Sequence, residues 1–264
     1  MKIIRKFIGD FIRSIRIGKN IQSDPYFIKT KQLITTELKK EPKRHDIINF
    51  LLTLTNSKQY LEIGVRNPDD NFNHILCEHK YSVDPGIEYL DYKVNFKMTS
   101  DVFFESLKTS ELELSKDIKF DVIFIDGLHL AQQVERDIQN SLNFINDHGF
   151  IVLHDCNPPT EFHQREDYYF RNSPAKGFWN GTTWKAFYKF RHLQDLYSIC
   201  FDTDWGIGVL SKRKWPMFNT LNGMENSYYG FKELQKSKNS HLNLQEFDFW
   251  KATLKNELKL NGVF

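Results

Sequence analysis

Two stretches decide the fold: Phe120-Asp-Val-Ile-Phe-Ile-Asp126-Gly-Leu-His129 and Gly149-Phe-Ile-Val-Leu-His154-Asp155-Cys156. Each is a short run of β-branched and aromatic residues, which is typical of a strand buried in a parallel sheet, and each ends in a carboxylate with a histidine nearby. Ligands of open α/β sheets bind beyond the carboxyl ends of the strands. If the two strands are neighbours, Asp126, His129 and Asp155 therefore converge on one crevice.

Strands are expected to alternate with helices, at residues 59–64, 79–84, 93–97, 120–126, 149–155, 196–201 and 205–210. Between two of these strands, residues 132–146 carry apolar side chains at helical spacing, which indicates a βαβ crossover. A three-residue turn separates the last two strands and predicts an antiparallel hairpin. We therefore predict an α/β fold with a doubly wound, mostly parallel seven-stranded sheet.

The sheet is expected within residues 46–211, between a basic amphipathic N-terminal arm, residues 1–45, and a C-terminal helical extension, residues 212–264. The extension has one apolar face, which predicts a helix that packs on the rest of the chain, formed by Phe247, Trp250, Leu254 and Leu258.

The first part of the arm, residues 1–19, has the pattern of a basic amphipathic helix. Its apolar residues recur at helical spacing, with cations elsewhere on the helical wheel; the apolar residues are Ile3, Ile4, Phe7, Ile8, Phe11, Ile12 and Ile15, and the cations are Lys2, Arg5, Lys6, Arg13 and Arg16. Such a helix can lie in a membrane interface. Packing onto its own domain or onto a second subunit is the favoured interpretation, and peripheral membrane contact through residues 1–19 stays open as the alternative.

Composition narrows the class of protein. With 264 residues, of which 40% are apolar and 15% aromatic, the chain can bury a sizeable core. The net charge of only +2 gives no strong field and argues against nucleic acid as a partner. Three widely spaced cysteines are typical of reduced core thiols, and no apolar run reaches the roughly 20 residues of a membrane span. These features predict a cytoplasmic protein.

Four short motifs, Tyr60-Leu-Glu-Ile-Gly-Val, Ser82-Val-Asp84-Pro and the two acid-tipped strands, carry a family resemblance. In order and spacing, roughly residues 46–211 resemble the class I S-adenosylmethionine-dependent methyltransferases. The Asp-Gly-Leu-His and His-Asp-Cys elements are most similar to metal-dependent O-methyltransferases of the macrocin and mycinamicin type, which act on sugars. The resemblance implies a sheet whose last strand is antiparallel, and methyl transfer to a sugar hydroxyl of a saccharide, glycolipid or glycosylated metabolite.

The resemblance also implies where S-adenosylmethionine binds. Glu62 and Gly64 fall in the first-strand motif beside the methionine part of the cofactor, and Asp84 matches the second-strand acid, whose carboxylate can accept hydrogen bonds from ribose hydroxyls. Asp126 completes the predicted cofactor set. Asp84 can also be a simple turn acid before Pro85. The loop after Gly64 departs from the family because it lacks the usual glycine-rich turn, but S-adenosylmethionine has no phosphates for such a turn to bind.

For the chemistry, the resemblance implies that His129 is the general base, because a neutral imidazole with a pKa near ~6.5 can take a hydroxyl proton. Asp126 and Asp155 would hold a divalent metal, most plausibly Mg²⁺, which lowers the pKa of the bound hydroxyl. The third ligand stays open between His154 and Asn157. His129 could instead only bind backbone, and His154, which should alternate with Asp155 along the strand, could be structural.

Other functions remain open. Asp202-Thr-Asp204 matches the Asp-x-Asp of sugar-nucleotide-dependent glycosyltransferases, although Asp and Thr are also ordinary turn formers. A non-catalytic scaffold that docks on a membrane or partner through its basic arm is a further alternative, and a homo-oligomer is compatible with the amphipathic arms. Residues 157–182 form an expected substrate lid, with Arg165, Arg171, Lys176 and Trp179 as candidates to contact a sugar or an anionic group.

Overall fold

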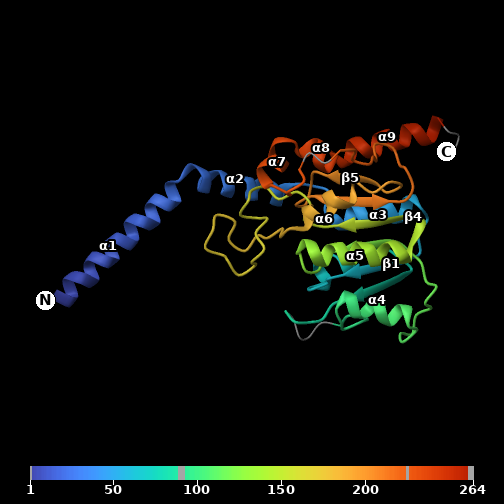
Figure 1. The fold of residues 1–264 in the computed structure, drawn as a ribbon, viewed down its shortest axis with the longest axis horizontal. Helices are drawn as coiled ribbons and strands as arrows, with labels where there is room; N and C mark the ends of the chain where they lie inside the picture. The colour runs from blue at the N-terminus through green and yellow to red at the C-terminus, as the bar shows by residue number, and fades with distance from the viewer. Residues whose placement is uncertain (1, 89–92, 224–225, 261–264) are drawn as a thin grey trace.

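A computed structural model describes residues 2–88, 93–223 and 226–260 of the chain (Figure 1). Its centre is a seven-stranded sheet in the order β2-β1-β3-β4-β6-β5-β7. The strands are β1 Gln59–Ile63, β2 His79–Val83, β3 Phe120–Ile125, β4 Ile145–Leu153, β5 Tyr197–Phe201, β6 Ile207–Ser211 and β7 Leu244–Gln245.

Strand direction follows the predicted doubly wound pattern. β2, β1, β3 and β4 are mutually parallel. β6 is antiparallel to both β4 and β5, so the predicted hairpin enters the sheet with its second strand between β4 and β5. The α/β fold with a mixed seven-stranded sheet, as expected of a Rossmann-like methyltransferase, is therefore confirmed.

One of the seven predicted strands is wrong. Residues 93–97 form no strand, and only Phe96 makes a parallel bridge, to Val83 at the edge of β2. The seventh strand is instead β7, whose Leu244 pairs with Cys200 on the opposite edge. The segment 93–97 contains Lys93, Asn95 and Lys97 around only two apolar residues, a pattern too polar to specify a buried strand.

Helices cover both faces of the sheet (Figure 1). One core is formed with α4 Ser100–Lys108, α5 Ala131–Phe144 and α6 Thr183–Phe190, together with the short helices α7 Phe231–Lys236 and α8 Lys238–Leu242. The other core is formed with α3 Arg44–Leu54 and α9 Phe247–Leu260. Neighbouring strand residues divide between the two cores, as Leu61 and Tyr60 do, because side chains alternate along a strand.

The C-terminal helix packs as its sequence predicts. Trp250 and Leu254 of α9 are buried, and Trp250 lies edge-on to Phe50 of α3. Leu258, the last residue predicted for this face, lies outside the side chains that the structure describes.

Two helices precede α3, namely α1 Lys2–Ser23 and α2 Pro25–Lys39. The carboxylate of Asp24 accepts hydrogen bonds from the amides of Tyr26 and Phe27, which starts α2 anew after α1. Ile34 of α2 is buried against the body, whereas α1 runs outward (Figure 1). The expectation that α1 packs onto its own domain is therefore wrong. Among the described residues, no helix combines the length and apolar character needed to cross a membrane.

Candidate active site

Strand register brings the predicted site residues together. Ile125 of β3 pairs with Ile63 of β1 on one side and with Leu153 of β4 on the other. The next residues along the three strands, Gly64, Asp126 and His154, therefore lie side by side at the carboxyl edge of the sheet. The predicted convergence of the two acid-tipped strands is observed, because the strands are neighbours in parallel register.

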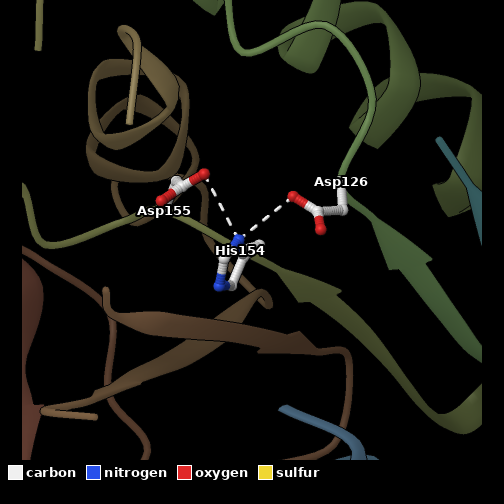
Figure 2. A group of neighbouring side chains, drawn as sticks. All are labelled: Asp126, His154 and Asp155. Carbon is white, nitrogen blue, oxygen red and sulfur yellow. Dashed lines mark hydrogen bonds and ion pairs between the residues drawn. The ribbon is translucent and has the colours of Figure 1, made fainter. Parts of the chain in front are cut away.

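Asp126, His154 and Asp155 form a compact cluster at this edge (Figure 2). Nδ1 of His154 lies 3.1 Å from Oδ1 of Asp126 and 3.2 Å from Oδ2 of Asp155. All three residues are largely buried, so the two carboxylates and the imidazole interact in a medium of lower polarity than water.

Asp155 has a left-handed backbone, with φ of 63°. This turn follows β4 immediately, and the His154 imidazole lies between the carboxylates of Asp126 and Asp155, in contact with both (Figure 2). His154 and Asp155 therefore do not point to opposite faces, as alternation along a strand predicts. The side chain of Asn180 donates a hydrogen bond of 2.8 Å to Oδ1 of Asp155 and helps to hold the carboxylate.

His129 joins the same cluster from the end of the β3–α5 loop, two residues before α5 begins. Its Nε2 lies 3.2 Å from Oδ1 of Asp126, and its Nδ1 lies 3.0 Å from Oδ2 of Asp155. Burial lowers the pKa of His129, but the carboxylates of Asp155 and Asp126 outweigh it and raise the pKa to about 10. In this state the imidazole is protonated at neutral pH, whereas the base role requires the neutral form.

Two further residues enclose the cluster: Arg44, which no sequence pattern indicates, and Asp204, which the sequence places only in the candidate Asp-x-Asp motif. Nη1 of Arg44 lies 3.4 Å from Oδ2 of Asp126, and the amide of Arg44 donates a 3.0 Å hydrogen bond to Oδ2 of Asp204. That same Asp204 oxygen is 3.7 Å from Nε2 of His154. Arg44 stood just before the expected domain boundary in a polar passage, and no spacing signal distinguished it from a linker residue.

Charge balance explains the protonation pattern of the cluster. Burial raises the pKa of Asp126, but His154, His129 and Arg44 outweigh it and hold that pKa well below its usual range. Burial lowers the pKa of His154, and Asp126 and Asp155 reverse this and hold the pKa well above its usual value. Carboxylates and cationic side chains therefore neutralise one another in the state described by the structure.

The Asp-x-Asp of residues 202–204 does not form one binding site. Asp202 lies 2.7 Å from Nζ of Lys40 and accepts a 2.9 Å hydrogen bond from Asn157, while Asp204 faces Arg44. Each carboxylate is thus paired with a different cation from the N-terminal segment, an arrangement of structural turn acids. Asn157, one candidate for a third metal ligand, contacts Asp202 instead of the cluster.

The end of β1 supplies the predicted cofactor residues. Oε2 of Glu62 accepts hydrogen bonds from the hydroxyl of Tyr60, at 2.6 Å, and from the side chain of Asn71, at 2.8 Å. Burial raises the pKa of Glu62 to about 7, although both hydrogen bonds act in the opposite direction. Asn71 lies between the 3-10 turns η1 Pro68–Asp70 and η2 Phe72–His74, which replace the glycine-rich loop of the family.

Gly64 and Asp84 shape the neighbouring loop. Gly64 has φ of 84°, and a Cβ there would lie 2.2 Å from Cα of Gly127, so the two loops approach too closely for any side chain. Asp84 accepts hydrogen bonds from the amides of Arg66, at 3.1 Å, and Gly86, at 2.6 Å. The carboxylate of Asp84 therefore orders the loops around the expected ribose position and also acts as a turn acid.

Residues 157–182 lie against the cluster. The indole of Trp179 stacks on His129, with ring centroids 5.0 Å apart and an angle of 17° between the planes. The amide of Thr182 donates a 2.7 Å hydrogen bond to the carbonyl of His129. Arg165 behaves differently from the expected anion ligand, because its guanidinium donates to carbonyls within this segment, including those of Phe162 and Phe178.

The cluster fits a divalent cation by its donor chemistry. Asp126, His154 and Asp155 each offer a ligand atom within 4.8 Å of the others, which gives two carboxylates and one imidazole. Carboxylates suit Mg²⁺ and Mn²⁺, and an imidazole suits ions such as Zn²⁺ and Fe²⁺. Of the two candidates for the third ligand, His154 is the one that the fold brings to the two aspartates.

Residues 41–156 match a protein family described as a methyltransferase domain. A search of the curated proteins found no match. The segment 41–156 includes every predicted cofactor, base and metal residue, and also Arg44.

Several solved structures are similar. The O-methyltransferase from Bacillus cereus, in complex with S-adenosylhomocysteine, is 13% identical with a TM-score of 0.44, over 74% of this chain and 97% of that chain. The S-adenosylhomocysteine-bound methyltransferase PaMTH1 of Podospora anserina is 13% identical with a TM-score of 0.43, over 76% of this chain and 96% of that chain. The O-methyltransferase TomG of Streptomyces achromogenes, in complex with S-adenosylmethionine, is 13% identical with a TM-score of 0.41, over 72% of this chain and 90% of that chain.

The family match coincides with the part of the sheet that carries the clustered residues, from the start of α3 to the end of β4. Residues 41–156 are therefore similar to a methyltransferase domain, and the predicted enzyme class, an S-adenosylmethionine-dependent methyltransferase, is confirmed.

Proposed function

We propose that the enzyme transfers the methyl group of S-adenosylmethionine to a hydroxyl oxygen on a sugar of a saccharide, glycolipid or glycosylated metabolite. The observation that carries this proposal is the position of Asp126. It follows Ile125, which pairs with Ile63 beside the cofactor loop, and its carboxylate contacts both His129 and His154. One residue thus joins the expected methyl donor to a cluster of proton-binding and cation-binding groups.

At the cofactor end, Glu62, Gly64, Asp84 and Asp126 are proposed to bind S-adenosylmethionine. Gly64 lets the loop after β1 lie against Gly127 without a side chain, and Asp84 holds the loop after β2 through two backbone amides. A carboxylate such as Asp84 can accept hydrogen bonds from vicinal ribose hydroxyls. Glu62 faces the same edge from β1, where an acid can bind the amino group of the methionine part.

At the acceptor end, His129 is proposed to take the hydroxyl proton while the oxygen attacks the methyl carbon in line with the departing sulfur. Asp126 and Asp155, with His154 as third ligand, would hold Mg²⁺ or a related divalent cation. Such a cation would lower the pKa of an acceptor hydroxyl and compete with His129 for the two carboxylates. Without those carboxylates the proton on His129 is less stabilised, so His129 can act as a base nearer to neutral pH.

Isothermal calorimetry with S-adenosylhomocysteine tests the donor site. Saturable binding by the full chain is expected, and Asp84→Ala should weaken it roughly tenfold if the carboxylate binds two ribose hydroxyls. Asp147→Ala, at a carboxylate that is 90% exposed near the start of β4 and thus at the opposite end of the strands, is the matched control and should bind like the wild type. If the wild type shows no binding with Mg²⁺, with Mn²⁺ or after chelation, the proposal fails and a non-catalytic scaffold becomes the better explanation.

Methyl transfer to a panel of free saccharides, glycolipids and phenolic alcohols tests the acceptor. Transfer of labelled methyl to sugar hydroxyls, and loss of transfer after chelation, are expected. Transfer to the phenols alone would overturn the sugar assignment while leaving the methyltransferase activity in place.

A further inference from the structure

Helix α1 carries an apolar face that the described part of the chain leaves uncovered. Its side chains recur three and four residues apart and therefore line one side of the helix. These residues, called the apolar face below, are 45–72% exposed: Ile4, Phe7, Ile8, Phe11, Ile12 and Ile15. Figure 1 shows α1 leaving the body, and six neighbouring large apolar residues in water are costly unless another surface covers them.

The remainder of α1 is basic. Besides the apolar face, the sequence of α1 contains a single acid, Asp10, and six cationic residues, which are Lys2, Arg5, Lys6, Arg13, Arg16 and Lys19. The charge of α1 is therefore strongly positive, although the whole chain has a net charge of only +2. Basic residues beside an apolar stripe are the pattern of a helix that lies in the plane of a lipid interface.

The positive charge of α1 indicates which kind of surface covers its apolar face. A second copy of α1 packed face to face would bring the cations of both helices together, at an electrostatic cost. An anionic lipid surface gains from the same cations, by roughly fivefold in affinity for each one near the surface. Since no described helix is apolar enough to cross a membrane, α1 would lie along the surface. We propose that α1 anchors the enzyme to the surface of an anionic lipid bilayer.

The arm connects this surface to the candidate active site. Tyr26 of α2 packs on Phe162, with ring centroids 5.5 Å apart, and Phe162 belongs to the segment 157–182 whose Trp179 stacks on His129. Lys40, one residue after α2, is paired with Asp202 of the body. A bound α1 would thus hold the acceptor side of the enzyme close to the lipid headgroups, a consequence that rests on the proposed function, whereas membrane binding itself does not.

Vesicle flotation of the full chain tests the anchor, with phosphatidylcholine alone and phosphatidylcholine mixed with phosphatidylglycerol. Ile15→Ser on the apolar face has a matched control in Ile17→Ser, the same change about 160° around the helix and at similar exposure, 45% against 49%. Ile15→Ser should weaken binding to the anionic vesicles about tenfold. Ile17→Ser should change it by less than about twofold, because its side chain does not reach the lipid.

The charges are tested separately. Arg13→Gln combined with Arg16→Gln should weaken binding to anionic vesicles by about 30-fold and leave the weak binding to neutral vesicles unchanged. Absence of flotation with anionic vesicles at low salt would overturn the proposal, as would equal losses in Ile15→Ser and Ile17→Ser. A concentration-dependent dimer that Ile15→Ser dissociates, without lipid binding by the wild type, would identify a second copy as the occupant. S-adenosylhomocysteine binding, measured in parallel, reports independently on the proposed function.

Discussion

Nη1 of Arg44 lies 3.1 Å from Nδ1 and 2.9 Å from Nε2 of His154. In the plane of the ring, Cε1 of His154 would block a position this close to both nitrogens. Nη1 of Arg44 must therefore lie over the face of the imidazole. Two groups that can both carry positive charge are in contact, and only the surrounding carboxylates of Asp126, Asp155 and Asp204 make this arrangement stable. The guanidinium therefore shares the carboxylates on which the proposed cation depends.

Replacing Arg44 with Gln is expected to have two opposite effects. It removes the ion pairs with Asp126 and Asp204, so the free energy of unfolding should fall by about 2–3 kcal/mol. It also removes a competing positive charge, so the affinity for Mg²⁺ or Mn²⁺ should rise roughly tenfold. Urea unfolding and calorimetry measure the two effects. Arg213→Gln, on an exposed arginine over Trp215, is the control, and unchanged cation affinity in Arg44→Gln would refute the competition.

Asp155 and Asp204 allow a matched test of the cation site, because both carboxylates face His154 but only Asp155 belongs to the three clustered ligands. Asp155→Asn should lower Mn²⁺ affinity by more than about tenfold, since it removes a charged ligand. Asp204→Asn should lower it less, because its carboxylate is 3.7 Å from His154 and is engaged by Arg44. Electron paramagnetic resonance of bound Mn²⁺ measures the affinity of each variant. A larger loss of affinity in Asp204→Asn than in Asp155→Asn would show that the cation binds at Asp204 and not at the three clustered ligands.

His129→Ala is expected to lower the rate of methyl transfer by a factor of about 10²–10⁴ and to leave S-adenosylhomocysteine affinity largely unchanged. In the wild type the rate should rise with pH, because the base acts only after losing a proton whose pKa is about 10 in the cation-free state. With saturating Mg²⁺ the midpoint of that rise should move to lower pH. A pH–rate profile with the same midpoint at all Mg²⁺ concentrations contradicts the proposed coupling between the base and the cation.

Glu62 should make the stability of the fold depend on pH. Burial raises its pKa from 4.5 to about 7, so between these values the folded state keeps a proton that the unfolded state has lost. The favourable contribution is complete below pH 4.5 and is lost as pH rises through 7, by roughly 3 kcal/mol in total. Urea unfolding at pH 5 and pH 8 should show a smaller decrease in Glu62→Gln than in the wild type. Equal decreases would place the ionised form of Glu62 in the folded protein.

The sequence was sufficient for the part of the fold that local patterns encode. The strands that lead to Asp126 and Asp155 each finish in an apolar run, residues 122–125 and 150–153, and these runs, with the length of the crossover between them, predict burial and neighbourhood. Strand β7 did not follow, since only two residues, Leu244 and Gln245, pair with β5, and no periodicity exists over so short a segment. Residues 93–97, Lys-Val-Asn-Phe-Lys, alternate polar and apolar side chains as a short strand does, but only Phe96 pairs, with Val83.

The candidate site likewise contains residues that local sequence patterns predict and residues that they do not. Asp126, His129 and Asp155 were predicted because each follows a recognisable strand, and adjacent strand ends converge. Arg44 and Asp204 reach the cluster from a helix start and a hairpin turn, and their approach depends on tertiary packing that leaves no local pattern. Likewise, alternation argued against His154, and only the left-handed backbone at Asp155 brings both neighbours to the same side.

Gly64→Ala tests the close contact between the loops after β1 and β3. The new Cβ would lie 2.2 Å from Cα of Gly127, and Gly64 has φ of 84°, so both the backbone and the neighbouring loop must shift. We expect a loss of about 2–4 kcal/mol in unfolding free energy and at least a tenfold loss in S-adenosylhomocysteine affinity. Gly177→Ala is the matched control, since no atom lies within 4 Å of its added Cβ, and it should change stability by less than about 0.5 kcal/mol. If Gly64→Ala folds with wild-type stability and cofactor affinity, the loop is free to move, and Gly64 has no special role in the cofactor site.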